Sequence, residues 1–137
     1  EMCIRDSNKY MGPEAKLYQN VKKNFKQFSL IRLENLSLLG TPDLLVSNNS
    51  GHFFTIELKV TKGNMLRFSS HQIGFHLKHP HNTFILAQAL GPRATKTSSI
   101  SMYRGSRISE LVACGLQLDA CYLGWEACRL ALEELGA

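Results

Sequence analysis

The chain has 137 residues, enough for one ordinary domain with a single hydrophobic core. Hydrophobic residues make up 44% of it and charged residues 20%, as in globular proteins, and no apolar run approaches the roughly 20 residues of a membrane span. The N-terminus also lacks the apolar segment of a signal peptide, so we expect a cytoplasmic protein without membrane contact.

The net charge of +5 is unevenly distributed along the chain. Residues 110–137 contain five acidic residues and one arginine, so residues 1–109 carry about +9. That basic part has only six acidic residues, and Asp43 and Glu57 are two of them. A basic body around a small acidic focus is typical of a protein that binds a polyanion near a cation site, although a solvated basic surface is also common.

The first expected helix follows a segment that matches nothing downstream. Residues 1–7 (EMCIRDS) resemble translated adapter sequence, so we treat residues 1–11 as a partly non-native tail and residues 12–137 as one domain. Pro13 is tolerated in a first helical turn, and apolar residues then recur at helical spacing to about residue 27. This spacing predicts a helix with Glu14 on its inward face.

Three strands, a helix, two more strands and two helices are expected after this first helix. Strands are expected at residues 28–33, 43–47, 52–61, 83–89 and 100–103. Further helices are expected from Ser69 or Ser70 to about Lys78, from Ser106 to about Leu118, and over residues 122–135. A turn signal at residues 48–51 joins the second and third strands into a hairpin, and residues 91–98 read as a polar, basic loop. The order predicts an α/β fold with a mixed central sheet flanked by helices and with extra C-terminal helices.

Charged residues interrupt two of the apolar strands. Pro42-Asp43 opens one run, and Glu57-Leu58-Lys59 lies inside the next. Residues two apart in a strand point to the same face, so Glu57 and Lys59 share a face. Burying a carboxylate and an ammonium is costly unless they pair or bind something. Two acids and a lysine at one sheet edge predict a metal site with a lysine beside it, as metal-assisted phosphodiester hydrolysis requires.

The cysteines and histidines suggest no second metal site. Cys114, Cys121 and Cys128 are seven apart, so on a continuous helix they would lie near one face. Zinc sites need closer cysteine pairs, so we expect free thiols. The histidines do not form a cluster with metal-ligand spacing.

The expected order of a helix, three strands, a helix and a strand, with Pro42-Asp43 and Glu57-Leu58-Lys59 on neighbouring strands, resembles the PD-(D/E)XK nuclease superfamily. Ser69-Ser70-His71-Gln72 is similar to the Ser-X-X-Gln opening of the second helix in VRR-NUC nucleases and in phage or archaeal Holliday-junction resolvases. The resemblance covers about residues 12–90 and leaves residues 91–137 as an unexplained C-terminal extension. It implies a restriction-endonuclease-like αβββαβ core.

The resemblance also implies roles for individual residues. Asp43, Glu57 and the main-chain carbonyl of Leu58 would bind Mg²⁺, with Mn²⁺ able to substitute. Lys59 would orient or deprotonate the metal-bound water, and Gln72 would contact that water or the DNA backbone. Glu14 is a further candidate metal ligand, or simply a favourable acid in a first helical turn. DNA-phosphate contacts are expected from Lys62, Arg67, Lys22 and Lys23.

The implied activity is that of a Mg²⁺-dependent DNA endonuclease in a prokaryotic or phage-infected cell. The small size leaves little room for a separate sequence-reading domain, which favours recognition of DNA structure such as a four-way junction. Resolution requires two symmetric cuts and therefore predicts a homodimer, for which the last helices could supply the interface. The alternatives are a VRR-NUC-type flap or nick nuclease, a restriction-like enzyme, and a non-catalytic DNA-binding relative.

Overall fold

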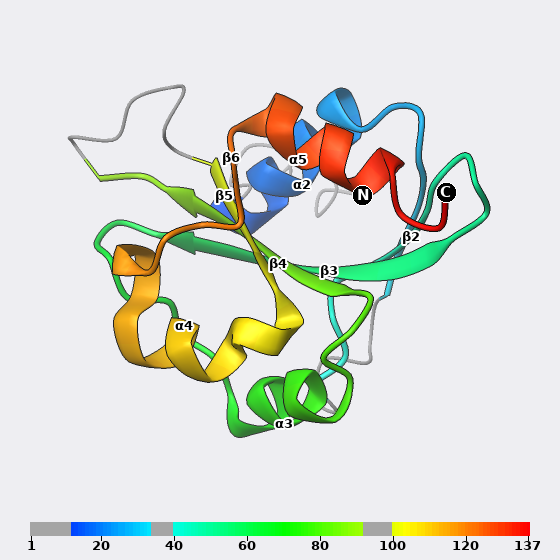
Figure 1. Ribbon diagram of the computed structural model, residues 1–137. Helices are drawn as coiled ribbons and strands as arrows, with labels where there is room; N and C mark the ends of the chain where they lie inside the picture. Colours follow the sequence, from blue (N-terminus) through cyan, green and yellow to red (C-terminus); the bar gives the residue numbers. More distant parts are fainter. Residues whose placement is uncertain (1–11, 34–39, 92–99) are drawn as a thin grey trace, which may run out of the picture.

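The computed structural model describes residues 12–33, 40–91 and 100–137, and these ranges form an α/β fold (Figure 1). Their four α-helices are α2 (Pro13–Asn24), α3 (Ser70–Lys78), α4 (Ile108–Cys114) and α5 (Trp125–Glu133). Their six strands are β1 (Ser29–Arg32), β2 (Leu44–Ser47), β3 (Phe53–Thr61), β4 (Thr83–Ala89), β5 (Ile100–Arg104) and β6 (Tyr122–Leu123). The predicted tail at residues 1–11, and all of the predicted loop at residues 91–98 except Gly91, lie outside the described ranges.

The six strands form one mixed sheet in the order β1-β2-β3-β4-β5-β6. Only β3 and β4 pair in parallel, with Glu57 beside Ile85, and α3 makes the crossover that parallel neighbours require. The predicted hairpin of β2 and β3 is confirmed, with Leu44 opposite Ile56. Gly51 takes a positive φ of 76° in its turn, a conformation that suits glycine.

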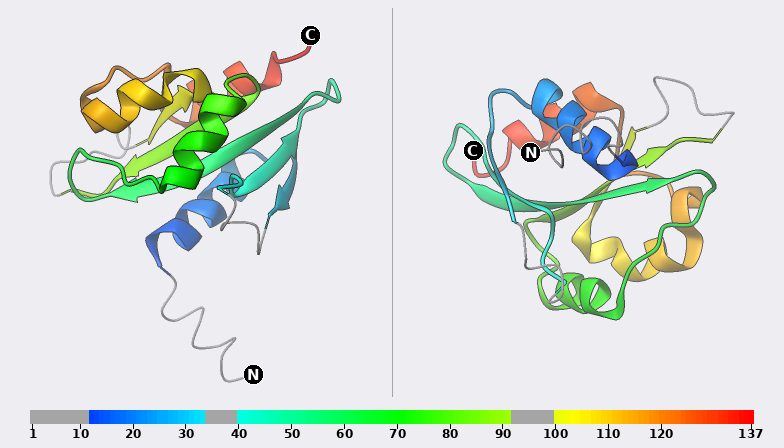
Figure 2. Two further views of the ribbon diagram at one scale, coloured as in Figure 1. Left: turned by 90° about the horizontal axis from the view of Figure 1, so that it is seen from below. Right: turned by 180° about the vertical axis from the view of Figure 1, so that it is seen from behind.

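Helices cover both faces of the sheet, as Figures 1 and 2 show. The core on one face contains buried residues of α2, of the strands and of α5, among them Leu17, Val21, Phe54, Ile56, Leu86, Met102 and Leu132. The core on the other face lies beneath α3 and α4 and contains Leu66, Ile85, Ala87, Tyr103, Ile108 and Leu111. The left view of Figure 2 looks onto α3 and α4. Because alternate residues of β3 and β4 enter different cores, the two charged residues of β3 can lie under α3.

Helix α2 ends at Asn24, three residues before the predicted end. Phe25 leaves the helical conformation while its N–H still bonds to the Val21 carbonyl. Phe25 and Phe28 are nevertheless both buried, with ring centroids 5.4 Å apart. The apolar pattern extends beyond the helix because the turn that follows α2 also packs into the core. The pattern therefore does not mark the end of the helix.

The two C-terminal helix predictions were wrong in their boundaries. The helix predicted over residues 106–118 is split into a 3-10 turn at Gly105–Arg107, α4, and a second 3-10 turn at Gly115–Gln117. The N-cap position of α4 is Arg107 and not Ser106. The helix predicted from residue 122 begins only at Trp125, because Tyr122–Leu123 pairs with β5 as β6. Gly115 and Gly124 have φ of 62° and 87°, and these conformations interrupt helical structure.

The three described cysteines consequently do not lie along one helix face. Cys114 is exposed, Cys121 is half-buried and Cys128 is buried, and all three are free thiols. Burial raises the pKa of the Cys128 thiol to about 12, so it remains protonated.

A buried asparagine joins the β2–β3 hairpin to the C-terminal extension. The Asn48 side chain donates to the carbonyls of Leu132 and Leu135 at 2.9 and 2.8 Å, at the end of α5. Its Oδ1 accepts the N–H groups of Ser50 and His52. The extension is therefore fixed to the same hairpin that carries the charged residues.

No helix in the described part of the chain is long and apolar enough to cross a membrane.

Candidate active site

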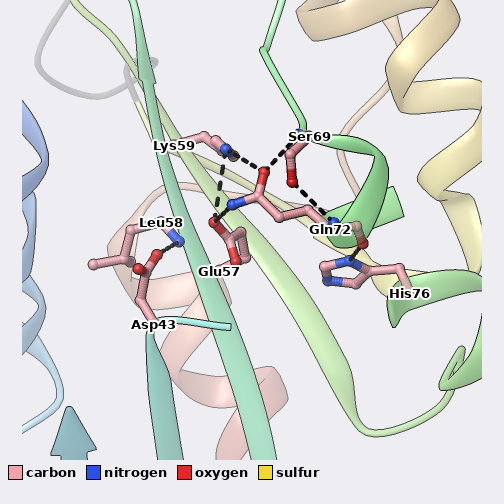
Figure 3. Close-up of polar contacts among 7 residues, drawn as sticks. All are labelled: Asp43, Glu57, Leu58, Lys59, Ser69, Gln72 and His76. Carbon is pink, nitrogen blue, oxygen red and sulfur yellow. Dashed lines mark hydrogen bonds and ion pairs between the residues drawn. The ribbon is translucent and has the colours of Figure 1, made fainter. Parts of the chain in front are cut away.

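Asp43 lies immediately before β2, one residue earlier than the observed start of that strand. The chain reaches it through Gly40, which has a φ of 76° and passes against the first turn of α3. A Cβ atom at position 40 would lie 2.2 Å from the His71 carbonyl oxygen, so a glycine is required for this approach. Asp43 Oδ2 accepts the Leu58 N–H at 2.8 Å, which holds the carboxylate against β3 (Figure 3).

Glu57 is a buried carboxyl in the middle of β3, with 2% of its surface exposed. Its Oε2 accepts the Gln72 Nε2 amide at 3.0 Å and lies 3.7 Å from Lys59 Nζ. Its Oε1 is buried without a hydrogen-bond partner. Burial first, and the nearby Asp43 carboxylate second, raise the pKa of Glu57 to about 8, although Lys59 acts in the opposite direction. The contacts with Gln72 and Lys59 therefore do not fully offset the cost of burying the Glu57 negative charge.

Lys59 projects from the same face of β3 as Glu57, as predicted from their spacing (Figure 3). Its Nζ donates to Gln72 Oε1 at 3.0 Å and lies 4.8 Å from the centroid of the Phe68 ring. An aromatic face attracts a cation at this distance. The ammonium is therefore positioned by an amide, a carboxyl and an aromatic ring, and 12% of its side chain is exposed.

Gln72 connects the helix α3 to both charged residues of β3 (Figure 3). It forms a capping box with Ser69, in which Ser69 Oγ accepts the Gln72 N–H and Gln72 Oε1 accepts the Ser69 N–H. The same Oε1 accepts from Lys59, while Nε2 donates to Glu57. The fully buried His76 donates from Nδ1 to the Gln72 carbonyl at 2.9 Å, and burial lowers the pKa of His76, which favours its neutral form.

Glu14 reaches the site from α2, on the opposite side of the sheet. It is exposed, so the expectation of an inward-facing side chain holds only in part, but it lies at the rim of a cavity of about 620 Å³ that Lys59 also lines. Partial desolvation and the Asp43 carboxylate raise the pKa of Glu14, while Lys59 and Arg32 act to lower it. Glu14 therefore lies within electrostatic range of the Asp43 and Glu57 pair.

The predicted DNA contacts fall into two groups. Lys62 and Arg67 line the same cavity as Lys59. Lys22 and Lys23 are exposed in the last turn of α2, about 12 Å along the helix axis from Glu14, so the structure does not bring them to the site. Sequence reasoning did not assign a role to Phe68, which contacts Lys59 through the fold and carries no motif of its own.

The oxygen atoms near β3 fit a hard divalent cation. Among residues 12–33, 40–91 and 100–137, no three His, Cys, Asp or Glu side chains gather as a metal-binding group, so two carboxylates would have to be completed by other oxygens. The N–H and C=O of one strand residue face the same edge, and the Leu58 N–H faces Asp43, so its carbonyl is directed to that edge too. Mg²⁺ is usually bound by one or two carboxylates and retains several waters. The unpartnered Glu57 Oε1 and the raised pKa of Glu57 are consistent with such an ion.

Comparisons of the chain with protein-family models, with curated proteins and with solved structures found no match. A functional assignment therefore depends on the residues of the site and on their arrangement.

Proposed function

We propose that this chain is a Mg²⁺-dependent DNA endonuclease of the PD-(D/E)XK superfamily, with a restriction-endonuclease-like αβββαβ core over about residues 12–90. The order α2, β1, β2, β3, α3, β4 supports this core. The observation that carries the proposal is the convergence of Asp43, Glu57 and Lys59 around Gln72, with the Glu57 carboxyl buried and its pKa raised.

Each residue has a distinct role in this proposal. Asp43, Glu57 and the Leu58 carbonyl would hold the ion, with Glu14 close enough to contribute negative charge. When bound, Mg²⁺ supplies a nucleophilic water of lowered pKa and neutralises charge on the scissile phosphate. The Lys59 ammonium stabilises the negative charge that develops on the phosphoryl oxygens, because it is already oriented by Gln72 and Phe68. Gln72 fixes the position of the Lys59 ammonium relative to the Glu57 carboxyl by bonding to both.

The substrate in this proposal is branched DNA, such as a four-way junction, cut by a homodimer. The cations that line the cavity support a polyanionic substrate. A flap or nick nuclease and a restriction-like enzyme use the same chemistry on other DNA, and a non-catalytic relative would bind DNA without cutting it.

A cleavage assay with Mg²⁺ or Mn²⁺ tests the proposal on a four-way junction, a flap, a nicked duplex, a linear duplex and a single strand. Asp43→Ala, Glu57→Gln and Lys59→Ala should each abolish cutting while DNA binding is retained. Glu126→Gln removes an exposed acid on α5 and should cut like the wild type.

The outcomes separate the candidate functions. Paired symmetric cuts confined to the junction support a resolvase, and cuts in another substrate support the corresponding alternative. Binding without cutting by any metal supports the non-catalytic relative. Near-normal cutting by Asp43→Ala or Lys59→Ala would exclude the proposed site.

A further inference from the structure

The segment between β3 and α3 places an exposed apolar side chain beside the candidate active site. The cavity of about 620 Å³ that Lys59 lines is also lined by Lys62, Met65 and Arg67. Met65 is 53% exposed, whereas its neighbour Leu66 is 6% exposed. Single exposed apolar residues are common on protein surfaces, so exposure alone assigns no role to Met65. Its surroundings are what give it significance.

Met65 lies between two fixed residues. On one side, the Asn64 carbonyl accepts the Leu116 N–H at 2.7 Å. The approach is so close that a Cβ atom on Gly115 would lie 2.3 Å from the Asn64 oxygen. On the other side, the Leu66 side chain is anchored in the core beneath α3 and α4. Because the backbone is fixed on both sides of Met65 and Leu66 occupies the core position, the Met65 side chain is directed outward.

The start of the same segment is also held by backbone contacts. The Thr61 carbonyl accepts the Leu90 N–H at 2.8 Å, and a Cβ atom on Gly91 would lie 2.8 Å from the Lys62 oxygen. The supporting residues directly follow β4 and α4. Part of the C-terminal extension therefore supports the residues that line the cavity, which gives this extension a role that its sequence did not suggest.

We propose that Met65 inserts beside a base of the bound DNA, and that the preferred substrate carries an unpaired or unstacked nucleotide next to the scissile phosphate. This inference rests on the proposed DNA endonuclease function. Lysine and arginine contacts to phosphates position DNA without distinguishing paired from unpaired bases. Apolar side chains, methionine among them, are used as wedges between bases in proteins that bend or kink DNA. Displacing a base costs least where it is already unpaired, so an exposed apolar side chain on a fixed backbone beside Lys59 selects such DNA.

The test measures equilibrium binding of the full chain to fluorescent DNA, in Ca²⁺ and separately in chelator. Two probes share one sequence: a perfect duplex, and the same duplex with one unpaired nucleotide. The variants are Met65→Ala, Met65→Leu and Met65→Lys. Leu77→Ala is the matched control, because Leu77 is another exposed apolar residue, on α3, with 59% of its surface accessible.

The wild type should bind the DNA with the unpaired nucleotide more tightly than the duplex. Met65→Ala should weaken that complex about tenfold, the loss expected when roughly half of a buried methionine contact is removed, and should leave duplex binding within about twofold. Met65→Leu should retain the preference, because it remains apolar. Met65→Lys should strengthen binding to both probes and abolish the preference. Leu77→Ala should behave as the wild type.

Other results would overturn the inference. Equal affinity of the wild type for both probes would do so, as would equal losses on both probes for Met65→Ala. If the protein cuts DNA and shows no such preference, the role of Met65 is refuted and the endonuclease proposal stands. If the protein neither binds nor cuts any DNA, both proposals fail.

Discussion

Replacing Glu57 by Gln should stabilise the metal-free protein at alkaline pH. The substitution keeps the size of the side chain and removes one negative charge from a position that is 2% exposed. A glutamine oxygen can still accept the Gln72 Nε2 amide, and its amide group can donate to the neighbouring Asp43 carboxylate. The variant would therefore keep the polar contacts of the site without a buried charge.

The magnitude follows from the pKa of Glu57. A rise from 4.5 to about 8 corresponds to about 5 kcal/mol against the ionised form, since one pKa unit is worth about 1.4 kcal/mol. Structural relaxation and water entry reduce such penalties in proteins, so we expect a net gain of about 2–3 kcal/mol for the variant above pH 8. Below pH 4.5 the carboxyl is protonated in both the folded and the unfolded chain, so the gain should vanish there. Between these limits the unfolded chain ionises first, so the wild type loses stability as the pH rises.

Urea unfolding in chelator at pH 5 and pH 8.5 measures this difference. The gain of Glu57→Gln should be small at pH 5 and should reach about 2–3 kcal/mol at pH 8.5, or about 6–12 °C in thermal unfolding. Mg²⁺ should stabilise the wild type at pH 8.5 and have little effect on the variant. Glu126→Gln, which changes an exposed acid, should show no such dependence on pH. A variant less stable than the wild type at pH 8.5 in chelator would refute this view of Glu57.

Three further predictions concern folding and metal binding. Asn48→Ala should destabilise the protein by about 2–4 kcal/mol in urea unfolding, because it removes four hydrogen bonds from a buried side chain to the backbone. The exposed Asn49→Ala should cost little. Similar midpoints for both variants would contradict the role of Asn48. Gly40→Ala should lower the free energy of unfolding by about 1–3 kcal/mol and abolish cleavage, because it combines an unfavourable φ with a clash against α3. Gly12→Ala is the control, because a Cβ atom there meets no atom within 4 Å. Full cleavage by Gly40→Ala would show that the approach of this segment to α3 is not needed. Mg²⁺ affinity, measured by calorimetry, should rise from pH 6 to about pH 8 because the ion must displace the proton of Glu57, and a flat profile would argue against Glu57 as a ligand.

The elements that carry the site could be predicted because their signals are local. The alternation in β3, the turn before it and the serine cap of α3 gave boundaries within one or two residues of those observed. The C-terminal part was predicted less well, because its structure depends on distant partners. Tyr122 and Leu123 become strand residues only by pairing with β5, and the turn at Gly115 fits against the Asn64 carbonyl. No local pattern encodes either contact.

In the candidate site, too, some features follow from the local sequence and others only from tertiary packing. The shared face of Glu57 and Lys59 follows from strand geometry alone. The position of α3 over these strands does not follow from strand geometry, and Gly40 passes close against the first turn of that helix. The Phe68 ring over Lys59 is likewise a product of tertiary packing.

The capping box of α3 makes helix initiation and site alignment a single cooperative event. Gln72 Oε1 accepts both the Ser69 N–H that begins the helix and the Lys59 ammonium, so one atom takes part in both. Whenever the first turn of α3 frays, Lys59 and Glu57 lose their common partner at the same moment. The fraction of molecules with an aligned site cannot then exceed the fraction with an intact first turn, so the local opening equilibrium of a nine-residue helix sets an upper limit on the proposed activity.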